Sequence, residues 1–187
     1  MILENTGIKT NTYFIPPFTL NEGEIVLIHL PNDERFYNIE MELVSIFTGK
    51  TKSENLKINR PLTFVPHIFE SHFRRRFYPM TVSKYLKKMS VQDNNFANKI
   101  YEHKFITKRT KVQALSGTSR KLLSLYTTLS QTKDIVFDVA GQDPSGVNET
   151  FEIVKSNVEK GGSAILIDCY KPREDGYLKY IELELIN

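Results

Sequence analysis

The sequence has only one cysteine, Cys169, so no disulfide can form within the chain. This cysteine usage predicts a reducing compartment, and we expect the protein in the cytoplasm. The sequence also lacks long apolar runs, because the stretches Ile25–Leu30 and Ala164–Ile167 are far too short to cross a bilayer. Met1–Thr12 shows no basic flank followed by an apolar segment, so no signal peptide is expected. Any contact with a membrane is therefore expected to be peripheral and to go through a partner.

Charge of one sign is not in clear excess. The 187 residues carry 25 lysines and arginines against 22 aspartates and glutamates, a net charge of +3 at pH 7. This mild balance does not by itself argue for nucleic acid. Hydrophobic residues make up 40% and charged residues 25%, which are ordinary values for a globular chain able to bury a core.

Short β-branched apolar runs alternate with stretches of helical periodicity along the chain. Strands are predicted at 24–30, 62–65, 135–137 and 163–169, and helices at 39–47, from 81, at 94–104, at 119–131 and from 143. The tail, 177–186, alternates apolar and polar residues, which is typical of a half-exposed antiparallel strand. Strands separated by helices predict an α/β fold, with a parallel-centred sheet, flanking helices and an antiparallel edge.

The stretch from about 77 to 111 is helical in pattern throughout and contains no predicted strand. We therefore expect a single domain over residues 1–187. Its core would span about 1–76 and 112–187, with 77–111 outside the sheet as a small helical subdomain.

Four segments stand in chain order at Phe18–Ile28, Leu115–Leu122, Ile135–Asp138 with Gly141–Gly146, and Lys160–Ile167. In that order they resemble the strand pair before the phosphate loop, the "LSGGQ" signature loop, the Walker B strand with the D-loop, and the approach to the switch histidine of ATP-binding-cassette (ABC-type) ATPases. The resemblance covers Ile2 to about Cys169. Together these segments imply a P-loop NTPase-like fold of the ABC ATPase kind.

The phosphate loop departs from the family pattern. The corresponding turn keeps Pro31 and Asn32 but lacks the glycines, the lysine and the Mg²⁺-binding hydroxyl, with Phe36 and Tyr37 among the residues in their place. Asp33 and Glu34 would put carboxylates near a triphosphate. Two like charges ~4 Å apart repel by ~4 kcal/mol at an effective dielectric near 20, or roughly three powers of ten in affinity. We therefore expect no bound ATP or Mg²⁺.

The catalytic positions are altered as well. Asp138 resembles the Walker B aspartate, but Val139 follows it where the family has a general-base glutamate, and valine cannot accept a proton. Asp168 stands where the switch histidine is expected, and His67 where the family has a glutamine. These changes predict no hydrolysis, so no catalytic residue and no metal ligand is assigned. A Mg²⁺ enzyme using Asp138 and Asp168 is a minor alternative, because nothing phosphate-binding accompanies the pair.

The signature-like residues Leu115, Ser116 and Gly117 allow two interpretations. They could donate to nucleotide held by a second cassette, as the resemblance implies. Alternatively, Ser116 or Thr118 simply caps the following helix. We favour capping, because the second glycine and the glutamine of the motif are missing.

Three consecutive arginines flanked by aromatic residues form the most unusual segment of the chain. The candidate docking residues are Phe69, Phe73, Arg74, Arg75, Arg76, Phe77 and Tyr78. Such a segment suits a protein partner, a phosphate backbone or an anionic membrane surface. In the family, this stretch lies in the groove that receives the coupling helix of a membrane subunit. The alternative is a solvated loop whose aromatic side chains dip into the core.

The leading hypothesis is a catalytically inactive cassette acting as a binding or regulatory subunit. Its partner would be a membrane permease subunit, an active cassette or a second copy of the chain. The first alternative is an ATP-binding, energy-coupling transporter subunit that forms the degenerate half of a pair. A third hypothesis is a toxin-neutralising or nucleic-acid-associated module, since a fold does not fix a function.

Overall fold

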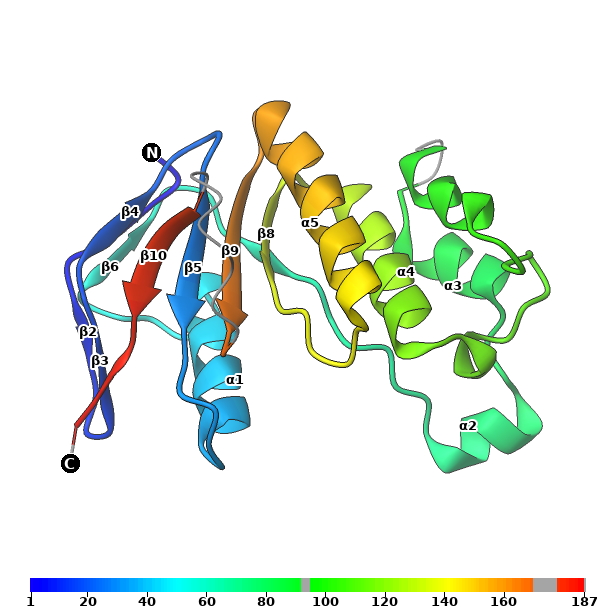
Figure 1. Ribbon diagram of the computed structural model, residues 1–187, viewed down its shortest axis with the longest axis horizontal. Helices are drawn as coiled ribbons and strands as arrows, with labels where there is room; N and C mark the ends of the chain where they lie inside the picture. The colour runs from blue at the N-terminus through cyan, green and yellow to red at the C-terminus, as the bar shows by residue number, and fades with distance from the viewer. Residues whose placement is uncertain (92–94, 170–177, 187) are drawn as a thin grey trace. The chain divides into compact units, whose positions relative to one another are not determined.

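The computed structural model describes residues 1–91, 95–169 and 178–186, with only the backbone of Leu178 (Figure 1). The chain forms two compact units. The sheet unit comprises Met1–Phe64, Asp134–Asp138 and Val154–Asn187, and the helical unit comprises Val65–Lys133 and Val139–Ile153. No helix within the described part of the chain is long and apolar enough to span a membrane.

The sheet unit is built on a five-stranded parallel sheet, as the alternation of strands and helices predicted. Its strand order is β10 (Leu178–Glu182), β5 (Ile25–His29), β9 (Ser163–Asp168), β8 (Asp134–Phe137) and β7 (Thr63–Phe64). Every neighbouring pair in this sheet is parallel. All residues of β8 and β9 are buried, which is characteristic of parallel strands covered on both faces.

Two small antiparallel sheets complete the strands of this unit. The first has the order β4 (Phe18–Leu20), β1 (Leu3–Asn5), β6 (Leu56–Ile58), and the second β11 (Glu184–Leu185), β3 (Tyr13–Ile15), β2 (Ile8–Lys9). They supply the antiparallel part of the predicted α/β fold.

The prediction of one antiparallel strand over 177–186 is wrong for most of the tail. β10 pairs parallel to β5, and only β11 runs antiparallel to its partner, β3. Leu183, between the two strands, is buried at 5% exposure. Alternation along a strand indicates one exposed face, but it carries no information on the direction of the partner strand. Tyr177 lies outside the described residues.

Helix α1 (Phe36–Phe47) connects the parallel sheet to the antiparallel strands through one hydrophobic cluster. Its inner face buries Ile39, Leu43 and Phe47 against residues of β5, β8, β9 and the antiparallel strands. The helix was predicted from Ile39 and begins one turn earlier. It ends where the Thr48 hydroxyl donates to the Val44 carbonyl.

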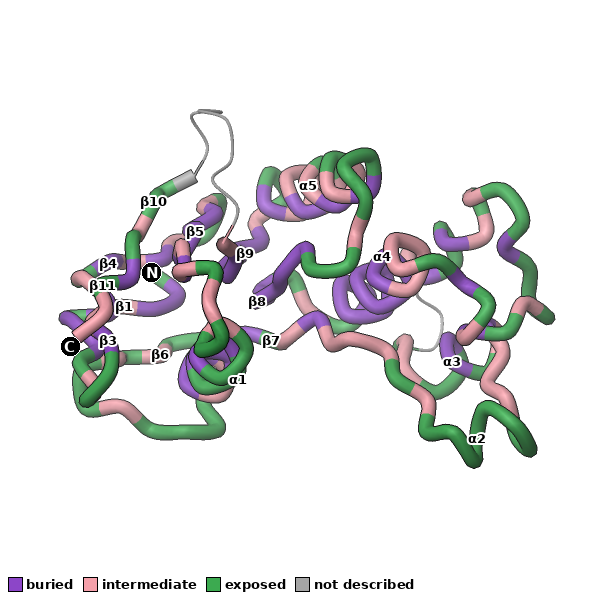
Figure 2. Tube along the Cα trace, turned by 60° about the horizontal axis from the view of Figure 1, so that its bottom comes forward, coloured by how far each residue is buried: buried purple, intermediate pink, exposed green. Residues whose placement is uncertain are grey.

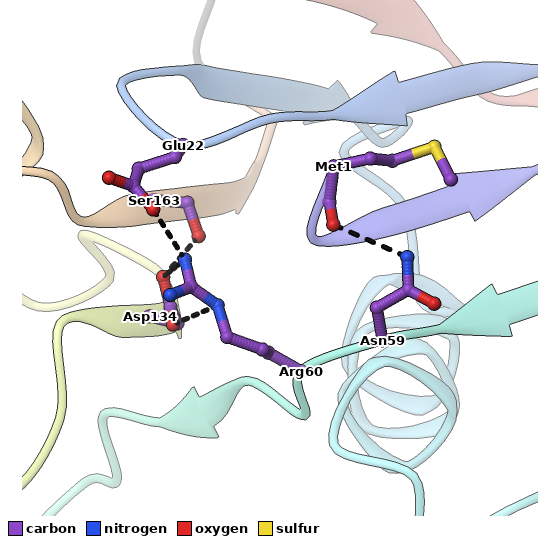
Figure 3. Close-up of polar contacts among 6 residues, drawn as sticks. All are labelled: Met1, Glu22, Asn59, Arg60, Asp134 and Ser163. Carbon is purple, nitrogen blue, oxygen red and sulfur yellow. Dashed lines mark hydrogen bonds and ion pairs between the residues drawn. The ribbon is translucent and has the colours of Figure 1, made fainter.

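A polar cluster at the amino ends of β8 and β9 centres on Asp134, which contacts both Ser163 and Arg60 (Figure 3). Asp134 and Ser163 are the first residues of these strands, and the Ser163 hydroxyl donates to Asp134 Oδ1 at 2.7 Å. Arg60 Nε lies 3.2 Å from Asp134 Oδ2, and Arg60 Nη2 lies 3.3 Å from Glu22 Oε2. This cluster lies at the edge opposite the carboxyl ends of the strands, away from the edge at which α/β proteins place their binding sites.

The helical unit contains α2 (His72–Phe77), α3 (Val82–Met89), the 3-10 helices η1 (Asn95–Glu102) and η2 (Val112–Ala114), and α4 (Gly117–Leu129). Helix α5 (Pro144–Glu159) begins in this unit and continues into the sheet unit after Ile153. Helix α4 is buried along most of its length, whereas α2 is exposed throughout (Figure 2). The predicted subdomain 77–111 falls inside this unit, with η1 as a 3-10 helix where an ordinary helix was expected.

Candidate functional site

The turn between β5 and α1, residues 30–35, contains the positions matched by sequence to a phosphate loop. It lies at the carboxyl end of the parallel sheet, where α/β proteins place their binding sites. The Leu30 amide donates to the Asp168 carbonyl at 3.0 Å, which fastens the turn to the end of β9. Asn32 and Glu34 are exposed.

The carboxylate of Asp33 folds back onto the start of α1. Asp33 Oδ1 accepts the Arg35 backbone N–H at 2.8 Å, and Oδ2 accepts from Arg35 Nε at 3.1 Å and Nη2 at 2.6 Å. These hydrogen bonds lower the pKa of Asp33 below its ordinary value, the guanidinium contributing most. A carboxylate at this place also meets the positive end of the helix dipole.

Two further amides, those of Asp33 and Phe36, have acceptors within the turn. The Asp33 N–H donates to the Pro31 carbonyl at 3.0 Å, and the Phe36 N–H donates to the Asp33 carbonyl at 3.1 Å. The predicted repulsion from Asp33 is therefore smaller than that of a free carboxylate, since Arg35 neutralises it. The backbone N–H groups of Asp33, Arg35 and Phe36 are all hydrogen-bonded within the turn and are not available to a phosphate without displacing these acceptors.

The two rings at the start of α1 lie in different environments. Phe36 is partly buried against the hydrophobic cluster of the sheet unit, whereas Tyr37 is 65% exposed. Neither side chain offers a positive charge to a phosphate or a metal ligand of the kind that Mg²⁺ prefers.

Asp138 and Asp168 lie at the carboxyl ends of neighbouring parallel strands, as predicted. Asp138 directly follows β8 and is fully buried, and Asp168 ends β9 at 7% exposure. β8 and β9 pair in parallel, with Phe137 opposite Leu166. Across the described residues, no group of three or more His, Cys, Asp or Glu side chains is arranged to hold a metal.

Cys169 follows Asp168 at the same edge of the sheet. Burial raises the pKa of its thiol, and the carboxylates of Asp168 and Glu40 raise it further. A thiol with a raised pKa is a poor nucleophile at neutral pH. The His29 ring nitrogen Nε2 lies 3.0 Å from the Cys169 carbonyl oxygen.

His67 and Val139, the remaining predicted positions, belong to the helical unit. Val139 is buried at 7% exposure. His67 is partly buried and lines an open cavity of about 280 Å³ in this unit, together with Gly117, Arg120 and Lys121. The predicted nucleotide-site positions are thus divided between the two units.

The signature-like segment confirms the capping interpretation. Ser116 is the N-cap of α4: its hydroxyl accepts the Ser119 N–H at 3.1 Å and donates to Ser119 Oγ at 3.1 Å. Gly117 lies so close to the backbone of Gly141 that a Cβ added to Gly117 would be 2.1 Å from the Gly141 carbonyl oxygen. Leu115 is buried.

Sequence reasoning missed the contact that joins the starts of α4 and α5. The Thr118 hydroxyl donates to Asp143 Oδ2 at 2.7 Å, and the Asp143 N–H lies 3.2 Å from the same hydroxyl oxygen. The hydrogen bond from Thr118 contributes most to lowering the pKa of Asp143. Only the Asp143-Pro144 helix start was visible in the sequence, and nothing there pointed to Thr118.

The predicted docking residues lie on α2 or within three residues of its ends, and their side chains are exposed. Exposure is 85% for Phe69, 63% for Phe73, 58% for Phe77 and 74% for Tyr78. The interpretation in which these aromatics dip into the core therefore does not fit. The rings of Phe73 and Phe77 lie 4.9 Å apart, and those of Phe73 and Tyr78 lie 6.5 Å apart.

The three arginines of α2 are also exposed. One of them, Arg75, donates from Nε to Gln113 Oε1 at 3.0 Å, which joins α2 to η2. Ser71 caps the helix by accepting the Arg74 N–H. α2 thus presents a cluster of aromatic rings beside cations, with no buried residue of its own.

Comparison with solved structures places this architecture among ABC cassettes. A protein from Pyrococcus furiosus, assigned as an ABC transporter ATP-binding protein, is similar over 96% of this chain and 97% of its own, with a TM-score of 0.70 and 18% identity. cbiO1 from Clostridium perfringens, part of the ABC transporter complex cbiONQ, is similar over 100% of this chain and 87% of its own, with a TM-score of 0.62 and 15% identity. A bacterial ABC transporter cassette solved as a dimer is similar over 100% of this chain and 99% of its own, with a TM-score of 0.63 and 15% identity.

No protein-family profile and no curated protein sequence matches the chain. At these identities, similarity to solved structures establishes the fold alone. The chain therefore has the fold of an ABC-type ATP-binding cassette, as the four motif-like segments predicted.

Proposed function

We propose that this chain is a catalytically inactive ABC-type cassette that acts by binding protein partners and does not hydrolyse ATP. The observation that carries the proposal is the position of the Asp33 carboxylate, which takes the Arg35 amide at 2.8 Å. An anion from the chain itself thereby occupies the helix start at which an ABC ATPase would bind phosphate.

The residues of this turn do not fit ATP with Mg²⁺. A triphosphate would have to displace the Asp33 carboxylate from the Arg35 amide and guanidinium. It would gain no lysine in return, and Phe36 and Tyr37 provide rings where a cation and a hydroxyl are needed.

The residue after the Walker-B-like strand supports the loss of hydrolysis. Val139 is buried and has no group that accepts a proton from water. Asp138 is fully buried and has a second carboxylate, Asp168, at the end of the neighbouring strand. The proposal therefore assigns these aspartates no catalytic role and the chain no nucleotide or metal cofactor.

The exposed aromatic and arginine side chains of α2 are the proposed docking surface. Exposed aromatic residues and arginines are enriched where proteins bind one another. The partner would be a membrane subunit, an active cassette or a second copy of this chain. The solved relatives support these choices, since one is part of a transporter complex and another was solved as a dimer.

The similarity to transporter ATP-binding subunits favours a second candidate function. In it, the chain is the degenerate half of a pair and its partner's site performs the turnover. The signature-like segment gives this candidate little support, because the Ser116 hydroxyl is engaged in capping and Gly117 is covered by the Gly141 carbonyl.

Calorimetric titration of the purified chain with Mg-ATP tests the proposal, and we expect no binding at low millimolar concentration. Micromolar affinity would overturn it. ATPase activity of the chain purified with its membrane partner separates the two candidates. Activity that disappears on Asp138→Asn would support the second one.

A further inference from the structure

The small net charge of the whole chain is the sum of opposite net charges on its two units. The helical unit carries 14 lysines and arginines against six aspartates and glutamates, a net charge of +8. The sheet unit carries 11 against 16, a net charge of −5. The excess of positive charge is therefore confined to one unit, where it can attract an anionic surface.

Part of this charge gathers in one turn, which we call the basic turn, residues 104–111. It contains four exposed cations and no acidic residue: Lys104, Lys108, Arg109 and Lys111. The turn is fixed to the start of α3, because the Val82 N–H donates to the Thr110 carbonyl at 2.9 Å and the Ser83 N–H to the Lys108 carbonyl at 3.2 Å. The cations thus extend from a defined backbone.

An aromatic ring stands among these cations. Phe105 is 92% exposed, while its neighbour Ile106 is buried at 8%. Among the residues that the structure describes, Phe105 is the one non-glycine residue with a positive φ, 68°. Bulky side chains disfavour this conformation. A ring held there in water contributes nothing evident to the stability of the fold.

We propose that the basic turn binds an anionic phospholipid surface directly, with the Phe105 ring among the headgroups and the surrounding cations over the lipid phosphates. Phenylalanine is among the side chains that membrane-surface segments bury at the boundary between headgroups and acyl chains, and clustered lysines and arginines are attracted to anionic lipids. The inference goes beyond the proposed function, because it needs neither a protein partner nor the loss of ATP binding.

A lipid surface suits this turn better than nucleic acid does. Proteins that bind single strands combine a basic groove with several rings on which successive bases stack. Here one ring projects from a tight turn, and Phe105 shares no ring contact with another aromatic residue of the described chain. A single ring between cations matches headgroups, which need no stacking platform.

Co-sedimentation of the full chain with vesicles tests the proposal. We expect binding to vesicles of phosphatidylcholine mixed with phosphatidylglycerol to be at least roughly tenfold tighter than to phosphatidylcholine alone, and to weaken as salt is added. Equal binding to both, or none to either, would overturn the proposal. No partner protein is present, so failure here leaves the proposed function unaffected.

Insertion of the ring can be followed directly, because the chain contains no tryptophan. Phe105→Trp should show a blue-shifted emission when anionic vesicles are added, and brominated lipids should quench it. Met41→Trp, at a 38% exposed position on α1, is the control and should show neither change. An unchanged emission of Phe105→Trp with bound vesicles would contradict insertion.

Charge reversal identifies the surface. The triple variant Lys104→Glu, Lys108→Glu, Arg109→Glu should lose roughly tenfold or more in affinity for anionic vesicles. The matched control, Lys50→Glu, Lys52→Glu, Lys57→Glu, changes the net charge equally at exposed positions of the sheet unit and should lose much less. Circular dichroism checks that both variants fold. Equal losses, or binding of the parent chain to a labelled oligonucleotide but not to vesicles, would refute the proposal.

Discussion

Asp33 and Arg35 form a closed pair at the start of α1, in which one carboxylate accepts both the backbone N–H and the guanidinium of the residue two positions later. The distance from Arg35 Nη2 to Asp33 Oδ2 is 2.6 Å. Both side chains are partly exposed, so this pair contributes little to stability. Its importance lies in what it occupies, the amide at the positive end of the helix.

The pair makes a prediction for the titration of Asp33. Its pKa in the folded chain is lowered by Arg35, so the stabilisation it provides is present at neutral pH and is lost as pH falls through that lowered value. Carbon NMR of the side-chain carboxyl should find a pKa below the ordinary value near 3.9. Arg35→Gln should raise it. An Asp33 pKa that does not respond to this change would contradict the pairing.

The approach of Gly141 to Gly117 makes a prediction for folding stability. Gly117→Ala would place a Cβ 2.1 Å from a backbone oxygen, which cannot move as freely as the end of a side chain. We expect a loss of about 1–3 kcal/mol in the free energy of unfolding, measured by urea denaturation. Ser145→Ala, at an exposed position near the start of α5, is the control and should stay within about 0.5 kcal/mol.

Tyr126, on α4, makes a prediction for alkaline conditions. Burial, and then the carboxylates of Glu149 and Glu102, raise its pKa to about 12. Because the folded value lies above the unfolded value near 10, the stability linked to this phenol is intact below pH 10. It is lost as pH rises toward the folded value. Ultraviolet difference titration should place one tyrosine near 12, and Tyr126→Phe should remove that step. A complete titration near pH 10 would contradict the assignment.

The parts of the fold that could be predicted from sequence are those set by buried periodicity. β5, β8, β9 and α1 were identified because a parallel sheet and its covering helix require continuous apolar runs and a four-residue spacing. The direction of β10 could not be predicted, because alternation describes faces and not partners. The capping role of Ser116 was predictable from its place before an apolar stripe.

The contacts that decide the candidate sites are of a different kind. The pairing of Thr118 with Asp143 joins residues 25 positions apart, and only the folded chain brings them together. The net positive charge of the helical unit could not be predicted from the overall composition either, because the acidic residues of the sheet unit offset it. Asp33 and Arg35 are close in sequence, but the hydrogen bond from the Arg35 backbone N–H to the Asp33 carboxylate depends on the geometry of the turn.

The most direct test compares the parent chain with a variant in which the turn is restored. The variant carries Asp33→Gly, Arg35→Gly, Phe36→Lys and Tyr37→Ser, which free the helix-start amides and supply a cation and a hydroxyl. Both chains are titrated with Mg-ATP by calorimetry under identical conditions. We predict no binding by the parent at low millimolar nucleotide and measurable binding by the variant. Micromolar binding by the parent chain would contradict the account.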